Sequence, residues 1–281
     1  MLYVVPPLPK IPWEKRLVPG SKGQPDVTLY LINASSTGAR PAIVHTHGGG
    51  FVTGTARMAI AQMQILAQRL DYVIVTVEYR LAPETHWMGS VEDNYAALKW
   101  HYLNAPALDV DAKRIAVMGE SAGGGHAALL ALTARDRSEV RLAFQCLTYP
   151  MLDDRTGTTR RVPDNVGTLM WMPPDNRFAW GAFLGMPPGG LRVPTKAVPA
   201  RVRDLSGLPP AFIGVGSLDL FADEDVEYAR RLNDAGVPAE LIVVPGAFHL
   251  FDGALAPISS WFSMARLDAL RRGLGIPLAK E

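Results

Sequence analysis

Gly119-Glu120-Ser121-Ala122-Gly123 lies between an apolar run at residues 115–118 and a helical segment at 127–132. A Gly-x-Ser-x-Gly pentapeptide between a strand and a helix predicts a tight turn with the serine at its apex. The two glycines suit such a turn because a side chain at either position would meet neighbouring backbone. Taken alone, the pentapeptide is equally compatible with a glycine-rich turn that only ends a strand. The rest of the chain therefore decides whether Ser121 is a nucleophile.

A serine nucleophile needs a base and an acid that orients the base, and two strand ends supply them. The hydroxyl is a weak nucleophile unless a base lies within hydrogen-bond reach. Reactive groups in parallel sheets gather at the carboxyl ends of strands. Asp219 follows an apolar run at 211–215, and His249 follows another at 241–244. The chain order Ser121, Asp219, His249 is that of the α/β-hydrolase arrangement.

Three other acids compete with Asp219 for the orienting role. Asp223, Glu224 and Asp225 begin the next predicted helix, where acidic side chains are expected for capping alone. Asp219 is therefore the preferred acid.

A glycine loop follows an earlier strand and suits an oxyanion hole. Glycines 48–50 come directly after the apolar run at 41–46, so their backbone can approach a substrate closely. The N–H of Ala122, next to the nucleophile, is a further donor. His47 is expected to fix this loop by hydrogen bonds and not to act as a base. A phosphate-binding loop is the alternative, but neither of its usual glycine patterns is present.

Five linked motifs together resemble the hormone-sensitive-lipase family of carboxylesterases. The resemblance runs from about residue 18 to the C-terminus and covers the two motifs above and three others. In chain order the motifs are His47-Gly48-Gly49-Gly50-Phe51, Glu78-Tyr79-Arg80-Leu81-Ala82-Pro83-Glu84, Gly119-Glu120-Ser121-Ala122-Gly123-Gly124, Asp219-Leu220-Phe221-Ala222-Asp223-Glu224 and Gly246-Ala247-Phe248-His249-Leu250-Phe251.

The resemblance implies a serine carboxylesterase that acts on short- to medium-chain esters without a metal or organic cofactor. It implies that Ser121 is the nucleophile, Asp219 the acid and His249 the base. It also implies an oxyanion hole formed by the N–H groups of Gly49, Gly50 and Ala122. An amidase, a peptidase or a polyester hydrolase could use the same triad, and a non-catalytic small-molecule-binding protein could use the same scaffold.

Strands that alternate with helices predict a mostly parallel sheet with helices on both faces. The resemblance implies the α/β-hydrolase fold, with about eight strands and a helical cap. We expect a single domain over residues 1–281, with an extended, proline-rich N-terminal arm at 1–25 and a cap insertion at about 151–206. The cap segment holds seven prolines between positions 163 and 199, and a connection of this length seldom lacks structure of its own.

The cap differs from the family pattern, and this bears on the substrate pocket. Family members usually carry a longer helical N-terminal stretch that forms half of the cap, so a reduced cap and a more open pocket are expected here. Arg80 and Glu84 are expected to form a structural ion-pair network. Six apolar side chains are candidates for the pocket lining, although each also suits an ordinary core: Phe51, Trp171, Trp180, Phe183, Leu220 and Leu250.

Composition and charge limit the kinds of partner and the locations that are expected for this protein. The net charge of +1, without a basic or acidic block, argues against a nucleic-acid partner. The one cysteine, Cys146, excludes an intrachain disulfide and a multi-cysteine zinc site and is compatible with a cytoplasmic location. The N-terminus does not resemble a signal peptide, and the apolar runs are too short to span a membrane. An edge strand or the N-terminal arm could support a homodimer.

Overall fold

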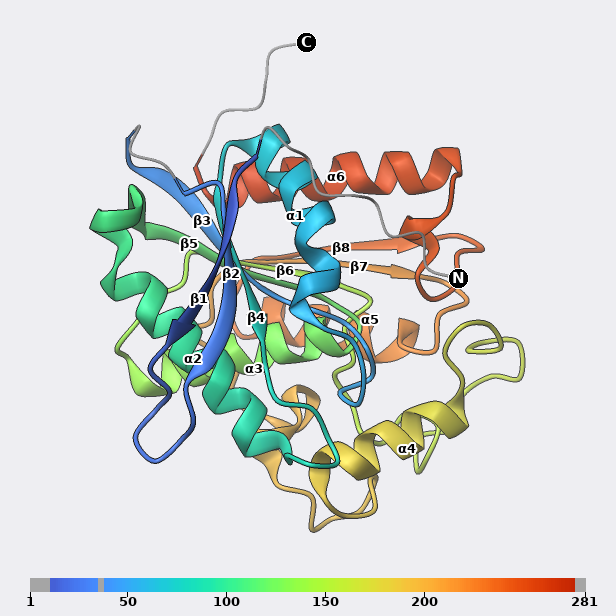
Figure 1. Ribbon diagram of the computed structural model, residues 1–281. Helices are drawn as coiled ribbons and strands as arrows, with labels where there is room; N and C mark the ends of the chain where they lie inside the picture. The colour runs from blue at the N-terminus through green and yellow to red at the C-terminus, as the bar shows by residue number, and fades with distance from the viewer. Residues whose placement is uncertain (1–10, 35–37, 276–281) are drawn as a thin grey trace.

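An eight-stranded sheet forms the centre of the protein in the computed structural model, which describes residues 11–34 and 38–275 (Figure 1). Its strand order is β1-β2-β4-β3-β5-β6-β7-β8. Strands β3 to β8 are parallel, whereas β2 is antiparallel to both β1 and β4. The strands are β1 Trp13–Val18, β2 Val27–Ile32, β3 Arg40–Thr46, β4 Val73–Glu78, β5 Val110–Glu120, β6 Phe144–Thr148, β7 Ala211–Gly216 and β8 Ala239–Val244. The predicted mostly parallel sheet is confirmed.

Helices cover both faces of the sheet, as predicted. Helices α2, α3 and α5 pack on one face, and α1 and α6 pack on the other (Figure 1). Neighbouring residues of the central strands point to opposite cores: Val44 joins the first core and Ile43 the second. The α-helices are α1 Ala56–Leu70, α2 Trp87–Leu103, α3 Ala122–Arg137, α4 Pro173–Leu184, α5 Ala222–Asp234 and α6 Pro257–Gly273, and the 3₁₀ helices are η1 Ala105–Leu108, η2 Thr195–Ala197, η3 Pro199–Arg201 and η4 Phe251–Gly253.

The described part of the N-terminal arm belongs to the sheet. Prolines exclude a helix there, but the stretch between Pro12 and Pro19 keeps its N–H groups and forms β1, which pairs with β2. The mild alternation of residues 27–32 favours an edge strand, but β1 lies at the edge and β2 lies between β1 and β4. Residues 1–10 of the predicted arm lie outside the described residues.

The motif around Arg80 pairs differently from the expected network. Arg80 donates to both carboxylate oxygens of Asp93, with the shortest distances at 2.8 Å, and to Gln24. Glu84 is exposed, and no ion pair to it is found among the described residues. A Ser-x-x-acid spacing such as that of Ser90 and Asp93 is typical of a helix start. Here α2 already begins at Trp87, and Asp93 binds Arg80 instead.

The segment between β6 and β7 carries α4 and the short helices η2 and η3. Helix α4 starts with two prolines, which suit the first turn because its N–H groups need no helical partner. It ends at Gly185, whose φ of 68° lies in the left-handed region. Trp180 and Phe183 of α4 are buried in the core that α2, α3 and α5 share.

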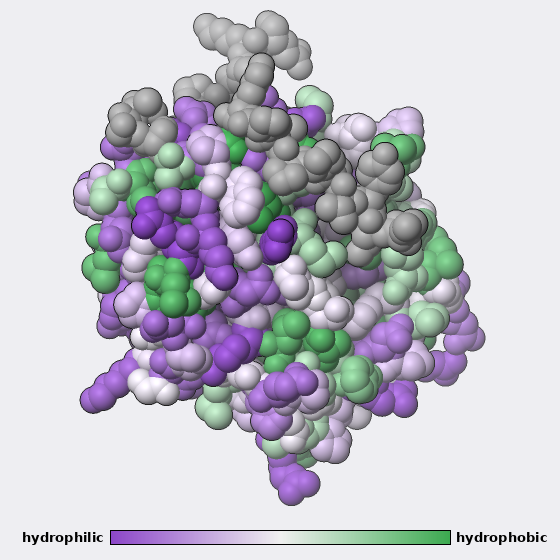
Figure 2. Space-filling model, in the orientation of Figure 1, coloured by the Kyte–Doolittle hydropathy of each residue, from purple (hydrophilic) through white to green (hydrophobic). Residues whose placement is uncertain are grey.

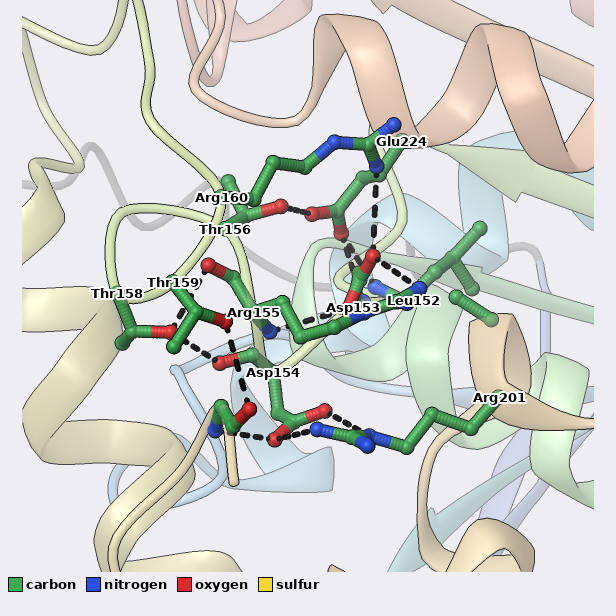
Figure 3. A network of polar contacts seen from close by, with 12 residues as sticks. Leu152, Asp153, Asp154, Arg155, Thr156, Thr158, Thr159, Arg160, Arg201 and Glu224 are labelled. Carbon is green, nitrogen blue, oxygen red and sulfur yellow. Dashed lines mark hydrogen bonds and ion pairs between the residues drawn. The ribbon is translucent and has the colours of Figure 1, made fainter. Parts of the chain in front are cut away.

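A buried polar network holds the first residues of this segment (Figure 3). Glu224 of α5 accepts hydrogen bonds from the N–H groups of Leu152 and Asp153, at 2.6 and 3.0 Å, and from the hydroxyl of Thr156. Asp154 is fully buried and binds Arg201 of η3 at 2.5 Å. The first residues of the segment are thus fastened to α5 and to η3, a later part of the same segment.

Candidate active site

Ser121 lies at the apex of a strained turn between β5 and α3. Its φ of 56° and ψ of −124° are unfavourable for a residue with a side chain. A β-carbon on Gly119 would lie 2.3 Å from the carbonyl oxygen of Gly123, and one on Gly123 would lie 2.1 Å from the carbonyl oxygen of Thr46. Both glycines are therefore required by the close approach of backbone.

Two short contacts link three buried side chains from distant parts of the chain. The Oγ atom of Ser121 lies 2.9 Å from Nε2 of His249, and Nδ1 of His249 lies 2.8 Å from Oδ2 of Asp219. The other oxygen of Asp219 accepts the N–H of Phe221 at 3.0 Å, which fixes the carboxylate. All three side chains are at most 5% exposed. A serine, an imidazole and a carboxylate linked in this way can remove the proton from the serine hydroxyl.

Aromatic rings enclose the imidazole of His249. The ring of Tyr149 meets it edge to face at 4.7 Å between centroids, and the ring of Phe221 does so at 5.3 Å. The indole of Trp171 lies 6.4 Å away. The sequence interpretation missed Tyr149, although this residue directly follows β6 and the same strand-end rule that selected Asp219 would have included it.

Two glycines of the loop after β3 have positive φ angles. Gly49 has a φ of 131° and Gly50 a φ of 59°. Among the described residues, the N–H groups of Gly49, Gly50 and Ala122 have no hydrogen-bond acceptor. Gly48 packs against the backbone of Glu120, since a β-carbon on it would lie 3.0 Å from that carbonyl oxygen. The loop is thus held next to Ser121 with free donors.

His47 and Tyr79 support this loop from below. Their rings stack at 4.2 Å, and the Tyr79 hydroxyl donates to the carbonyl oxygen of His47 at 2.5 Å. Nδ1 of His47 lies 2.9 Å from the carbonyl oxygen of Gly48. Burial lowers the pKa of His47 to about 4, so its ring is neutral near pH 7. The predicted structural role of His47 is consistent with these contacts.

The six candidate lining residues occupy four different places. Phe51, Trp180 and Phe183 form a buried aromatic cluster, with Phe51 stacked on Phe183 at 4.0 Å. Leu220 is buried, and a β-carbon on Gly167 would lie 2.7 Å from it. Leu250 is 37% exposed beside His249.

The sixth, Trp171, lies across the site. A β-carbon on Gly50 would lie 2.3 Å from Cη2 of Trp171, so the indole spans from the glycine loop toward His249. Its Nε1 donates to Asn176 at 3.3 Å, and its own N–H closes a three-residue turn around Met170, whose φ is 65°. Ser121 itself is 5% exposed.

Among the described residues, no group of three or more His, Cys, Asp or Glu side chains could hold a metal ion. The same residues contain no helix that is long and apolar enough to cross a membrane.

Comparisons with known proteins identify the family of this chain. The sequence pattern of a family with the α/β-hydrolase fold matches residues 43–253. The chain belongs to the hormone-sensitive-lipase-like carboxylesterase family of α/β-hydrolases. Within this family, the carboxylesterase NlhH of Mycobacterium tuberculosis is 36% identical over 244 residues, which cover 83% of this chain and 74% of that protein. The ethyl acetate hydrolase of Pseudomonas putida is 31% identical over 220 residues, which cover 76% and 66%.

Solved structures of the α/β-hydrolase family give the same result. A bacterial heroin esterase has a TM-score of 0.89 and 39% identity, and the match covers 95% of this chain and 85% of that one. This α/β-hydrolase is therefore a carboxylic ester hydrolase, and the predicted fold and enzyme class are confirmed.

Proposed function

We propose that the protein is a serine carboxylesterase in which Ser121, Asp219 and His249 form the catalytic triad. The observation that carries the proposal is the pair of contacts, 2.9 and 2.8 Å, that joins the serine to the imidazole and the imidazole to the carboxylate. In the tautomer protonated at Nδ1, His249 donates to Asp219 and leaves Nε2 free to accept the hydroxyl proton.

The reaction proceeds through an acyl-enzyme on Ser121. As Oγ attacks the ester carbonyl, Nε2 of His249 takes its proton, and the imidazolium then gives that proton to the leaving alcohol. Water, deprotonated by the same imidazole, attacks the acyl-enzyme and releases the acid. The unpaired N–H groups of Gly49, Gly50 and Ala122 support their assignment as the oxyanion hole, because a preorganised donor is worth on the order of 100- to 1000-fold in rate.

We further propose that residues 151–206 form the cap and that Trp171 is its part over the substrate. The contact of Trp171 with Gly50 supports this assignment. A ring so close to the glycine loop restricts the room for a long acyl chain, so we infer short to medium acyl chains. The relative that hydrolyses ethyl acetate by its name agrees with a short acyl group.

The test is a series of p-nitrophenyl esters of increasing acyl length, together with p-nitroanilides of the same acids. We expect the highest kcat/KM for short or medium esters, a fall for long ones, and much slower anilide cleavage. Anilides cleaved faster than matched esters would identify an amidase or peptidase instead. Binding of the esters without turnover would identify a binding protein.

Three further assignments belong to the same proposal. A cytoplasmic location fits the single, buried cysteine thiol of Cys146. Absence of nucleic-acid binding fits the net charge of +1. Figure 2 shows hydrophilic and hydrophobic residues side by side on one face of the molecule. A homodimer fits the position of β8 at the edge of the sheet and the exposed side chains Ile258, Trp261 and Met264 of α6. Light scattering of wild type and Trp261→Glu tests the dimer, which the variant should weaken.

A further inference from the structure

One arginine of α6 lies between two carboxylates that flank the catalytic side chains in sequence. Nη1 of Arg266 is 3.6 Å from Oε1 of Glu120 and 3.4 Å from Oδ2 of Asp252. Glu120 directly precedes Ser121, and Asp252 lies three residues after His249. The two segments that carry the nucleophile and the base are thus bridged by a single guanidinium.

Both carboxylates have a second, specific partner. The other oxygen of Glu120 lies 2.9 Å from Nε2 of His45, whose Nδ1 lies 2.9 Å from Oγ1 of Thr76. The other oxygen of Asp252 accepts the hydroxyl of Tyr149 at 2.5 Å. The side chains of Glu120, Arg266 and Asp252 are between 14% and 18% exposed, so solvent screens their interactions only in part.

Tyr149 carries this network to the base. Its hydroxyl is fixed by Asp252, and its ring faces the imidazole of His249 at 4.7 Å. Tyr149 also has a φ of 35°, an unfavourable value for a residue with a large side chain, so the surrounding contacts must hold it there. A displacement of Asp252 would therefore reach the imidazole through a rigid aromatic ring.

We propose that Arg266 is a positioning residue of the triad: by holding Glu120 and Asp252 together it fixes Ser121 relative to His249, and its charge offsets the two carboxylates behind the site. This inference rests on the proposed function. It extends that proposal to a residue of α6 that lies outside the five sequence motifs.

The charged groups of the bridge stabilise one another in the folded protein. Burial alone would raise the pKa of Glu120, but His45 and Arg266 together lower it. Burial alone would lower the pKa of Arg266, but Asp252 and Glu120 raise it. Arg266 is thus held charged by the two carboxylates, and Glu120 by His45 together with Arg266.

The pH dependence of the base depends on every charged or titratable group around it. The titratable side chains in direct contact with His249 are Asp219 and Tyr149, and Ser121 is its third partner. Asp225 lies near Asp219, and Asp252 binds Tyr149. The charged or titratable groups beyond Asp252 are Arg266, Glu120, His45 and Cys146. Within this set, Arg266 is the only permanent positive charge. Replacing Arg266 with a neutral residue should therefore stabilise the protonated imidazole of His249. The acidic limb of the kcat/KM profile should then move to higher pH.

The experiment compares Arg266→Gln, Arg266→Lys and Asp252→Asn over a pH series. We expect Arg266→Gln to lower kcat by on the order of 10-fold or more with KM changed less than about 2-fold, and to raise the acidic limb by roughly half a pH unit. Arg266→Lys keeps the charge, so the limb should stay in place while kcat falls in part. Asp252→Asn keeps an acceptor for Tyr149 but removes a negative charge, so the limb should move the opposite way.

Controls separate positioning from general damage and from failure of the proposed function. Arg272→Gln removes an exposed ion pair with Glu240 from the same helix and should leave the profile unchanged. Titration of the His249 ring protons by NMR gives the pKa without turnover, so the inference is testable even if the esters are not substrates. If Arg266→Gln does not fold, Arg266→Lys and Asp252→Asn still carry the test. Equal His249 pKa values in wild type, Arg266→Gln and Asp252→Asn would overturn the inference, as would an Arg266→Lys limb displaced as far as that of Arg266→Gln.

Discussion

At the scale of single residues, adjacent glycines of the loop after β3 face different neighbours. A β-carbon on Gly49 would lie 1.9 Å from the backbone oxygen of Thr53, whereas one on Gly50 would meet only the tip of the Trp171 side chain. The φ of Gly50, 59°, is tolerable for alanine at a cost of about 1–2 kcal/mol, but the φ of Gly49, 131°, is not. The two positions should therefore respond differently to alanine.

We expect Gly49→Ala to lower kcat/KM by on the order of 100-fold or more, because the loop must shift and displace its donors. Gly50→Ala should also be impaired, but Trp171→Ala should restore much of the loss by removing the clashing ring. Steady-state kinetics of the single and double variants measure this coupling. If Trp171→Ala rescues both alanine variants equally, or neither, Trp171 does not lie against Gly50.

Some residues of the site could be predicted from the sequence, and others could not. Ser121, Asp219 and His249 each follow a strand, and the parallel sheet brings strand ends together, so their proximity could be predicted. Arg266 and Asp252 could not be predicted in this way. They meet because α6 packs across β6 and η4, a tertiary contact that no spacing in the sequence encodes.

At the scale of elements, α5 does more than follow the Asp219 turn. Its first-turn acids were expected only to cap the helix, but no side chain caps α5, and Glu224 turns away to bind the start of the 151–206 segment. Burial, together with the charge of Asp153, raises the pKa of Glu224 well above its ordinary value. Glu224 is thus a buried acceptor that fastens this segment.

Glu224→Ala should lower the free energy of unfolding by at least about 2 kcal/mol, because it leaves two buried N–H groups and a hydroxyl without their acceptor. Asp234→Ala is the matched control on the same helix. It breaks only the exposed pair with Arg230 and should cost at most about 0.5 kcal/mol. Urea denaturation measures both, and equal destabilisation would show that Glu224 does not fasten the segment.

Elements also show where local sequence rules are overridden. A serine–acid spacing at residues 90–93 favours a helix start at Ser90, yet Asp93 is drawn into the pair with Arg80 and α2 begins one turn earlier. Prolines at 12 and 19 exclude a helix but leave room for β1, whose pairing with β2 depends on residues outside the segment itself.

At the scale of the whole molecule, the order of strands and helices could be predicted because periodicity and glycine or proline breaks mark each unit. The position of the Trp171 ring next to Gly50 could not. The proline-rich composition of residues 151–206 indicates an insertion but does not indicate where a given side chain points.

One buried histidine, His101, contributes to the dependence of the unfolding free energy on pH. Burial lowers the pKa of His101 to about 4, and neither ring nitrogen has a partner among the described residues. The unfolded chain therefore binds a proton there below about pH 6.5 that the folded protein does not bind until about pH 4, so this group makes stability fall as the pH drops through that window. Glu224 and Asp225, whose pKa values burial raises, contribute with the opposite sign.

Comparison of wild type with His101→Leu isolates the histidine from these carboxyls. Between pH 6.5 and 5, the free energy of unfolding should fall less steeply in the variant than in wild type. The two slopes should differ by up to about 1.4 kcal/mol per pH unit, which is the effect of one proton. Urea unfolding at several pH values gives both slopes. Identical slopes would mean that His101 is protonated in the folded protein or exposed in it.

The central claim is that Ser121 is the nucleophile of an ester hydrolase, and its most direct test is the hydrolysis of p-nitrophenyl butyrate by purified wild type and Ser121→Ala. Ser260→Ala, at an exposed serine of α6, is the control and should retain full activity. We predict that Ser121→Ala lowers kcat by on the order of 10⁴-fold or more while the protein stays folded. Full activity in folded Ser121→Ala would contradict the account.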